Sequence, residues 1–146
     1  MIDTNLLGYL FGIDRSEGKM LFLQEYVKGL LNTGWKLYIS SQVCKELARI
    51  SHEKYDLPLK EINDILERIT KVFNILYEDC QDLKTAILLK ERYYLQFWNA
   101  IIIASALNNN IPFILSEDTP YREIEFHHKK VKLFNPFSEN LNFEVQ

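Results

Sequence analysis

Apolar and polar positions along the chain divide it into short strand-like runs and longer helical stretches. Apolar spacing and capping residues predict six helices: residues 6–11, 16–34, 42–54, 58–69, 79–94 and, from the stretch that follows, 93–110. Alternating or unbroken runs of strand-forming residues predict strands at residues 1–2, 35–39, 71–77, 111–118 and 131–137. Strands separated by helices are typical of an α/β protein whose sheet is mainly parallel.

This order of elements predicts the fold class and the place of a functional site. We expect one α/β domain over residues 1–146, with a mainly parallel sheet of four or five strands covered by helices on both faces. In such sheets, ligands bind beyond the carboxyl ends of the strands. Polar or turn-forming residues predict where helices begin: Thr4 or Asn5, Ser40 or Ser41, Pro58 and Asp79.

Composition narrows the class of protein. Apolar residues make up 47% of the chain and charged residues 25%, which is typical of a soluble globular protein. The formal net charge of −3 provides no global attraction for polyanions, so local patches would have to hold any nucleic acid. Without a basic N-terminal region or a long apolar run, we expect a cytoplasmic protein with no signal peptide or membrane span. Cys44 and Cys80 are expected to be reduced, buried thiols.

Acidic residues follow three of the predicted strands. Asp3 and Asp118 each end an apolar run and precede a threonine, and Glu46 lies in the early turns of the helix after another strand. Asn99 lies near the start of an otherwise apolar helix, where an unpaired buried amide would cost about 1–3 kcal/mol. Because the carboxyl ends of parallel strands share one edge, we expect these side chains to converge. The carboxylates would repel one another by roughly 4 kcal/mol a pair, and Mg²⁺ or Mn²⁺ would relieve that repulsion.

Each of these residues also has an ordinary structural explanation when it is taken alone. Asn99 would be a helix N-cap, and Asp3 would be a turn residue at the end of a strand. Asp118 would form an Asx-turn with the residues after it, and Glu46 would be a solvated charge on a helix face. The joint placement of the four residues favours a metal site over these separate explanations.

Five segments carry a resemblance to a known family: MIDTNLL, SSQVCKEL, FWNAIIIASAL, ILSEDT and LFNPF. Taken in this order over nearly the whole chain, they resemble a PIN-domain ribonuclease of the VapC toxin type. The opening DTN, the FWxA helix and the SED strand end are the most specific parts. The resemblance implies a three-layer α/β fold with catalytic ligands around Mg²⁺ or Mn²⁺: Asp3, Glu46, Asn99 and Asp118, supported by Asn5 and Ser116.

The chain departs from the family pattern at two places. The family has FWDA where this chain has FWNA, so Asn99 stands at the position of an aspartate. An asparagine offers one oxygen ligand but no negative charge, which implies weaker metal binding and slow or absent cleavage. The change is either natural or introduced to disarm a toxic nuclease. The second departure is the first strand, where only Met1 and Ile2 precede Asp3.

The resemblance implies a Mg²⁺- or Mn²⁺-dependent endoribonuclease that is the toxin half of a toxin–antitoxin pair. Its partners would be an RNA substrate, a second copy of the chain in a homodimer, and a cognate antitoxin protein. The alternative is a catalytically silent PIN domain that binds RNA or protein. A phosphatase-like or nucleotide-binding enzyme is disfavoured, because the five glycines form no GxGxxG or Walker pattern.

Two further motifs have less specific interpretations. FHHKKVK, residues 126–132, is expected to be a solvated strand edge, whose adjacent histidines point to opposite faces and so do not bind one metal ion. The aromatic run YYLQFW, residues 93–98, is expected in the core or at a subunit interface rather than stacked on bases. Lys45 and Arg122 are the basic residues nearest the predicted site along the chain.

Overall fold

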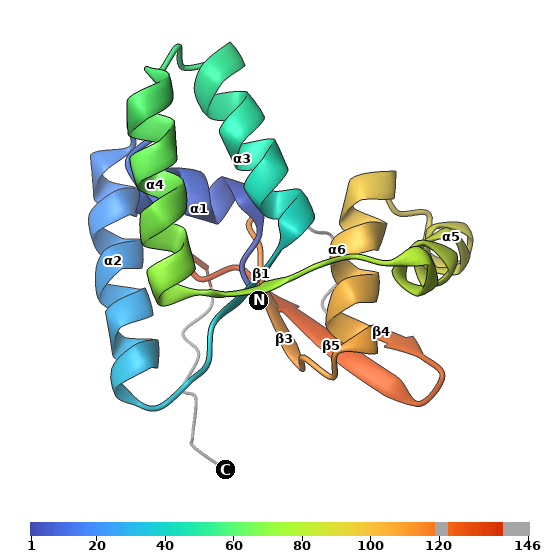
Figure 1. The fold of residues 1–146 in the computed structure, drawn as a ribbon. Coiled ribbons are helices and arrows are strands. Elements are labelled where there is room, and N and C mark those ends of the chain that lie inside the picture. Colours follow the sequence, from blue (N-terminus) through green and yellow to red (C-terminus); the bar gives the residue numbers. More distant parts are fainter. Residues whose placement is uncertain (119–122, 139–146) are drawn as a thin grey trace.

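Six helices alternate with five short strands in the computed structural model, which describes residues 1–118 and 123–138 (Figure 1). The helices are α1 (Thr4–Leu10), α2 (Glu17–Asn32), α3 (Ser41–Glu53), α4 (Leu59–Val72), α5 (Cys80–Tyr93) and α6 (Phe97–Asn108). The strands are β1 (Tyr38–Ser40), β2 (Asn74–Leu76), β3 (Phe113–Leu115), β4 (Glu123–Phe126) and β5 (Lys129–Phe134). All six predicted helices are present, and most strands are shorter than their apolar runs predict.

Residues 1–3 join two small sheets into one layer. On one side, the backbone N–H of Ile2 donates to the Tyr38 carbonyl of β1 over 3.0 Å. On the other side, the N–H of Asp3 donates to the Leu115 carbonyl of β3 over 3.0 Å. The N–H of Leu115 in turn donates to the Met1 carbonyl over 2.8 Å, and Ile2 pairs with Leu115 in a parallel bridge. This segment is the very short first strand that the sequence predicts.

The strands are mainly parallel, as predicted. β1 pairs with β2, and β3 pairs with β5, in parallel register. Among the described strands only β4 is antiparallel, beside β5 at the end of the order β3-β5-β4. β4 is missing from the predicted strands because its alternation of polar and apolar residues covers only four positions.

The turn between β4 and β5 corrects the interpretation of the histidine pair. His127 and His128 have positive φ angles of 47° and 64° and connect the two strands. A two-residue hairpin turn of this kind needs positive φ at both central positions. The two histidines are exposed as expected, but they lie in a turn and not on a strand.

Local capping chemistry positions α3 and α5 where the sequence predicts them. The Ser40 hydroxyl accepts a hydrogen bond from the N–H of Val43 over 3.1 Å at the start of α3. Asp79 and Asp82 form a reciprocal capping box at the start of α5, with both hydrogen bonds at 3.0 Å. Such caps satisfy N–H groups that have no partner within the helix.

Two other predicted caps are wrong. Asp3 caps α1 in place of Thr4 or Asn5, because its carboxylate accepts a hydrogen bond from the Thr4 N–H. Asn99 is the third residue of α6, whose N-cap is Gln96, so the explanation of Asn99 as an N-cap is also wrong. The helix starts earlier because Gln96 already has extended backbone angles, φ −64° and ψ 145°.

The helices cover the strands from two sides. Figure 1 shows α1 to α4 on one side of the N-terminal segment and α5 and α6 on the other. The most enclosed helix is α6, in which every residue from 100 to 107 is buried. This arrangement is the predicted α/β fold with helices on both faces. In the described part of the chain, no helix combines the length and apolarity that a membrane crossing requires.

The expected burial of the two cysteines is wrong. Cys80 is exposed and Cys44 only partly buried, because Cys80 opens α5 outside the stripe of that helix that is buried. For the run 93–98, Tyr94, Phe97 and Trp98 are 90%, 38% and 52% exposed, so these three rings are not in the core, and a place at a subunit interface stays a prediction. They lie at the turn between α5 and α6, where Tyr94 has a left-handed backbone with φ 54°.

Two adjacent leucines of α5 test the assignment of the core. Leu89 is 0% exposed, so Leu89→Ala should lower the free energy of unfolding by about 2–5 kcal/mol. Leu88 is 48% exposed, and Leu88→Ala should change that free energy by no more than about 0.5 kcal/mol. Urea denaturation followed by circular dichroism measures both. Equal losses in the two variants would contradict the assignment.

Candidate functional site

Three of the predicted site residues lie at the carboxyl edge of the strands. Asp3 ends the segment between β1 and β3, and Asp118 follows the last residue of β3 at a short distance along the chain. Glu46 lies in the second turn of α3, which begins directly after β1. The parallel arrangement therefore directs all three carboxylates to the edge where α/β sheets bind ligands.

Thr4 connects two of these carboxylates. Its backbone N–H donates to Oδ1 of Asp3 over 2.7 Å, and its hydroxyl donates to Oε2 of Glu46 over 2.7 Å. The Ser116 hydroxyl donates to Oδ2 of Asp3 over 2.9 Å. Thr4 and Ser116 are both 4% exposed, so these hydrogen bonds are shielded from water. The sequence pattern indicates Thr4 only as a possible helix cap, whereas the structure makes it the link between Asp3 and Glu46.

Asp118 is held by a different residue. The side-chain amide of Asn5 donates to Oδ2 of Asp118. Both side chains are exposed. Asp118 therefore lies on the open side of the site, while Asp3 lies on its enclosed side.

The carboxylates influence one another electrostatically. Burial raises the pKa of Asp3 above its ordinary value, and the hydrogen bonds from Thr4 and Ser116 oppose that increase. The charges of Glu46 and Asp118 raise the pKa further. Within the described residues no cation enters this balance. A divalent cation would favour the ionised carboxylate and remove the repulsion.

The carboxylate oxygens of these three acids are suitable ligands for a hard cation. Across residues 1–118 and 123–138, no three Asp, Glu, His or Cys side chains form a ready-made metal cage. Mg²⁺ does not need one, because it usually keeps several water ligands and binds through one or two carboxylates. The oxygen atoms of Asp3, Glu46 and Asp118 are ligands of the kind that Mg²⁺ and Mn²⁺ prefer. The residues present therefore fit such an ion.

Asn99 is the predicted site residue that the structure does not connect to the others. It is half-buried in the first turn of α6. Within the described residues it forms no hydrogen bond to Asp3, Glu46 or Asp118. The start of α6 nevertheless lines the same cavity as the start of α3, the helix that carries Glu46.

Glu78 is a further carboxylate at this edge, and the sequence pattern could have revealed it. It follows β2 as the apolar run ends, so the strand-end rule applies to it too. The Ser41 hydroxyl and the Gln42 backbone N–H, the latter at 3.2 Å, donate to its carboxylate. Burial by itself would raise the pKa of Glu78, but the hydrogen bonds outweigh burial and lower that pKa below its ordinary value. Glu78 thus stabilises the N-terminus of α3.

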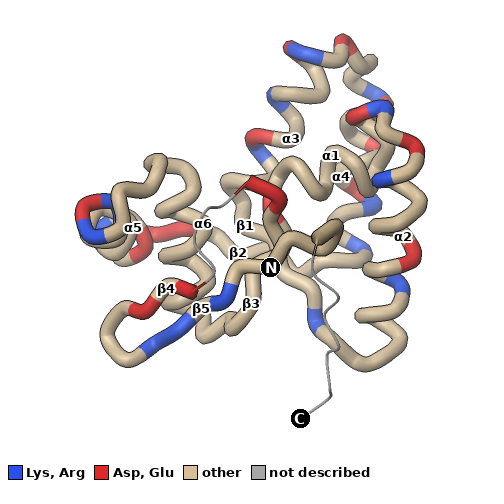
Figure 2. Tube along the Cα trace, turned by 180° about the vertical axis from the view of Figure 1, so that it is seen from behind, with Lys and Arg blue, Asp and Glu red and all other residues tan. Residues whose placement is uncertain are grey.

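A basic residue reaches the site from a distant part of the chain. Lys19 of α2 donates to the carboxylate of Glu117, the neighbour of Asp118. Of the two basic residues predicted near the site, Lys45 is exposed on α3 and Arg122 lies outside the described residues. Figure 2 shows Lys and Arg spread over several helices and strands, interspersed with acidic residues. Within the described part of the chain, positive charge near the site therefore comes from individual residues such as Lys19 and not from one extended basic patch.

Comparison with known protein families matches residues 1–127 to the family described as PIN domain. PIN domains are typically nucleases, which are hydrolases acting on RNA or DNA, and they usually use divalent metal ions. The matched residues contain all six helices and the three carboxylates. No curated protein matches the chain.

Glu78→Gln tests the electrostatic role of Glu78 at the start of α3. Because the pKa of Glu78 is lowered on folding, its charge stabilises the protein above its ordinary pKa of 4.5, and this contribution is lost as the pH falls through the lower folded value. The variant should therefore lose about 1 kcal/mol of unfolding free energy at pH 7. The difference should close in acid below the ordinary pKa.

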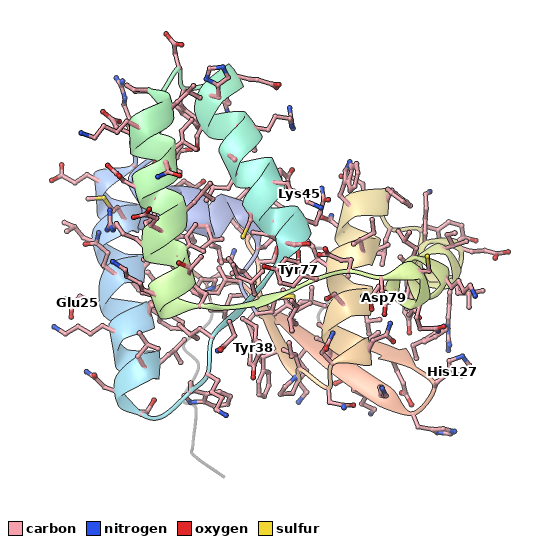
Figure 3. All side chains as sticks on the ribbon, viewed as in Figure 1. Glu25, Tyr38, Lys45, Tyr77, Asp79 and His127 are labelled. Carbon is pink, nitrogen blue, oxygen red and sulfur yellow. The ribbon has the colours of Figure 1, made fainter. Side chains whose placement is uncertain are left out.

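Urea denaturation over a pH series measures this difference. Glu25→Gln is the matched control, because Glu25 is exposed on α2, away from the start of α3 (Figure 3). The control should stay within about 0.5 kcal/mol of the unmodified chain at every pH. A loss for Glu78→Gln that is the same at all pH values would show that its charge is not involved.

Proposed function

The chain belongs to the PIN domain family, and from this premise we propose that it is a Mg²⁺- or Mn²⁺-dependent endoribonuclease. The observation that carries the proposal is the gathering of carboxylates around the half-buried Asp3, whose pKa is raised by burial and further by the charges of Glu46 and Asp118. Carboxylates gathered at the carboxyl edge of a sheet are costly for the fold unless they serve a cation. Perturbed acids in such a position are typical of catalytic sites.

In this proposal, Asp3, Glu46 and Asp118 would hold the metal ion. When bound, the ion would act as a Lewis acid that neutralises charge on the phosphodiester and lowers the pKa of water. Thr4 and Ser116 keep the Asp3 carboxylate in one orientation, so little rearrangement is needed during the reaction. Asp118 is exposed and is positioned by Asn5, so it would be the carboxylate most accessible to an approaching RNA.

Asn99 limits the activity of this chain. Its amide can offer one oxygen to the site, but it lacks the negative charge of the aspartate that the family pattern has at this position. We infer weaker metal binding and slow cleavage as a result. The alternative function is a catalytically silent domain that binds RNA or protein. It is favoured by the isolation of Asn99, which forms no hydrogen bond to the three carboxylates within the described residues.

The biological role that we propose is that of the toxin in a toxin–antitoxin pair. Its support is the resemblance of five sequence segments to VapC-type toxins. On this basis the protein is cytoplasmic, forms a homodimer and binds a cognate antitoxin. Size measurement of the purified protein, with and without a co-expressed neighbouring gene product, tests these partners.

Cleavage of a structured RNA pool in Mn²⁺ tests the proposed reaction. Asn99→Asp should increase the cleavage rate by about tenfold or more, because it restores a charged ligand. Asp3→Asn, made in the Asn99→Asp background, should reduce that rate by about a hundredfold, and EDTA should abolish it. Asp64→Asn in the same background is the control, because Asp64 is exposed on α4, a helix that carries none of the site residues.

The outcomes separate the candidate functions. Cleavage by the Asn99→Asp form alone would support the metal site with residue 99 as its limiting position. Mn²⁺ binding without cleavage by either form would favour the silent domain. Cleavage that is equal in EDTA and Mn²⁺ would contradict metal dependence.

Thermal unfolding measures metal binding independently of cleavage. Mn²⁺ at a hundred times its Kd should raise the free energy of unfolding by about 2.7 kcal/mol. Asp118→Asn should reduce this gain, because it removes an exposed ligand without disturbing the core. A melting temperature that Mn²⁺ leaves unchanged would contradict the proposed site.

A further inference from the structure

A cavity of about 260 Å³ lies where the starts of α3, α5 and α6 meet. One wall carries the aromatic rings of Phe97 and Trp98. Lys45 of α3 also lines the cavity, and Asp79 borders it at the start of α5. Figure 3 shows Lys45 on the side of α3 that faces α6.

The two aromatic rings are available to a ligand. Phe97 and Trp98 are 38% and 52% exposed, and their centroids are 5.2 Å apart at an interplanar angle of 67°. Exposed aromatic faces of this kind are the platforms on which single-stranded nucleic acids stack their bases. Because these rings stand outside the core, burial in this chain does not explain them.

The cavity adjoins the proposed active site. Gln42, which lines the cavity, lies one helical turn before Glu46 on α3, so both side chains share one side of that helix. Lys45, also in the lining, directly precedes Glu46. A strand whose phosphate reaches the carboxylates would therefore have a neighbouring nucleotide within reach of the cavity.

The polar groups of the cavity distinguish RNA from a protein partner. Lys45, Glu78 and Asp79 border it together with the rings. The centre of a protein–protein interface is depleted of Lys, Glu and Asp, so this mixture does not suit one. A nucleotide uses the rings and the lysine together, since its base stacks on a ring and its phosphate binds a lysine. The carboxylates of Glu78 and Asp79 are already held by hydrogen bonds at the starts of α3 and α5.

We propose that this cavity is a subsite for one unpaired nucleotide of a single-stranded RNA. The base stacks on Trp98, and the adjacent phosphate binds Lys45. The subsite rests on the proposed ribonuclease function and deepens it, because it selects single-stranded substrate beside the cleaving carboxylates. It binds RNA without the metal ion.

Fluorescence anisotropy with a labelled single-stranded RNA of about eight nucleotides tests the subsite in EDTA, where no cleavage occurs. Trp98→Ala should weaken binding roughly 5- to 100-fold. Trp98→Phe, which keeps a ring, should weaken it less. Tyr94→Ala is the matched control, because Tyr94 is 90% exposed but does not line the cavity, and it should bind as the unmodified chain does.

Two further measurements report stacking and charge directly. The chain has two tryptophans, so Trp35→Phe leaves Trp98 as the only tryptophan fluorophore. Its emission should be quenched by the RNA with the same Kd as the anisotropy. Lys45→Gln should reduce the slope of log Kd against log salt by roughly 0.7, the value for one phosphate of a single strand.

The results separate the subsite from the nuclease activity. Trp98-dependent binding in EDTA, with no cleavage in Mn²⁺ even by the Asn99→Asp form, would support the subsite and overturn the proposed reaction. Cleavage in Mn²⁺ with equal RNA binding by Trp98→Ala and the unmodified chain would overturn the subsite alone. A loss of dimer in Trp98→Ala with unchanged RNA binding would assign this surface to a protein interface and would also overturn the subsite. The absence of RNA binding in EDTA would overturn the subsite as well.

Discussion

Backbone hydrogen bonds of residues 1–3 join the two small sheets of this protein into one layer. β1 pairs with β2, and β3, β5 and β4 form a separate ribbon; residues 1–3 bond to both β1 and β3. A two-stranded ribbon is only marginally stable in water, so the single layer depends on this short segment. The same segment ends at Asp3, which caps α1 and is a half-buried acid of the candidate site. The connection of the sheets and the placement of the first carboxylate therefore have one structural cause.

The start of α3 joins the two parts of the functional surface. Its first turns are fixed by the Ser40 cap and by the Glu78 carboxylate. From this fixed end the helix presents Glu46 to Thr4 and borders the aromatic cavity with Gln42 and Lys45. The carboxylates at the site oppose stability, because burial and repulsion raise the pKa of Asp3. Such unfavourable placement of charge is common where a site is shaped for function.

The sequence by itself determined the features that depend on neighbouring residues. Apolar spacing located all six helices, and Ser40 and Asp79 marked the starts of α3 and α5, because a cap bonds within its own first turn. The change from an apolar run to an acid located Asp3 and Asp118 at the carboxyl ends of strands. The same rule would have located Glu78. The motif segments indicated the family to which residues 1–127 match.

Only the tertiary structure decided which distant residues meet. Thr4 reaches Glu46 across 42 positions, and Ser116 reaches Asp3 across 113 positions. The exposure of Phe97 and Trp98, the turn at the histidine pair and the approach of Lys19 to Glu117 likewise became visible only in three dimensions. Local periodicity specifies which face of an element is apolar, but not which other segment covers that face. Contacts between distant segments depend on the packing of the whole chain, and the details of the site follow from that packing.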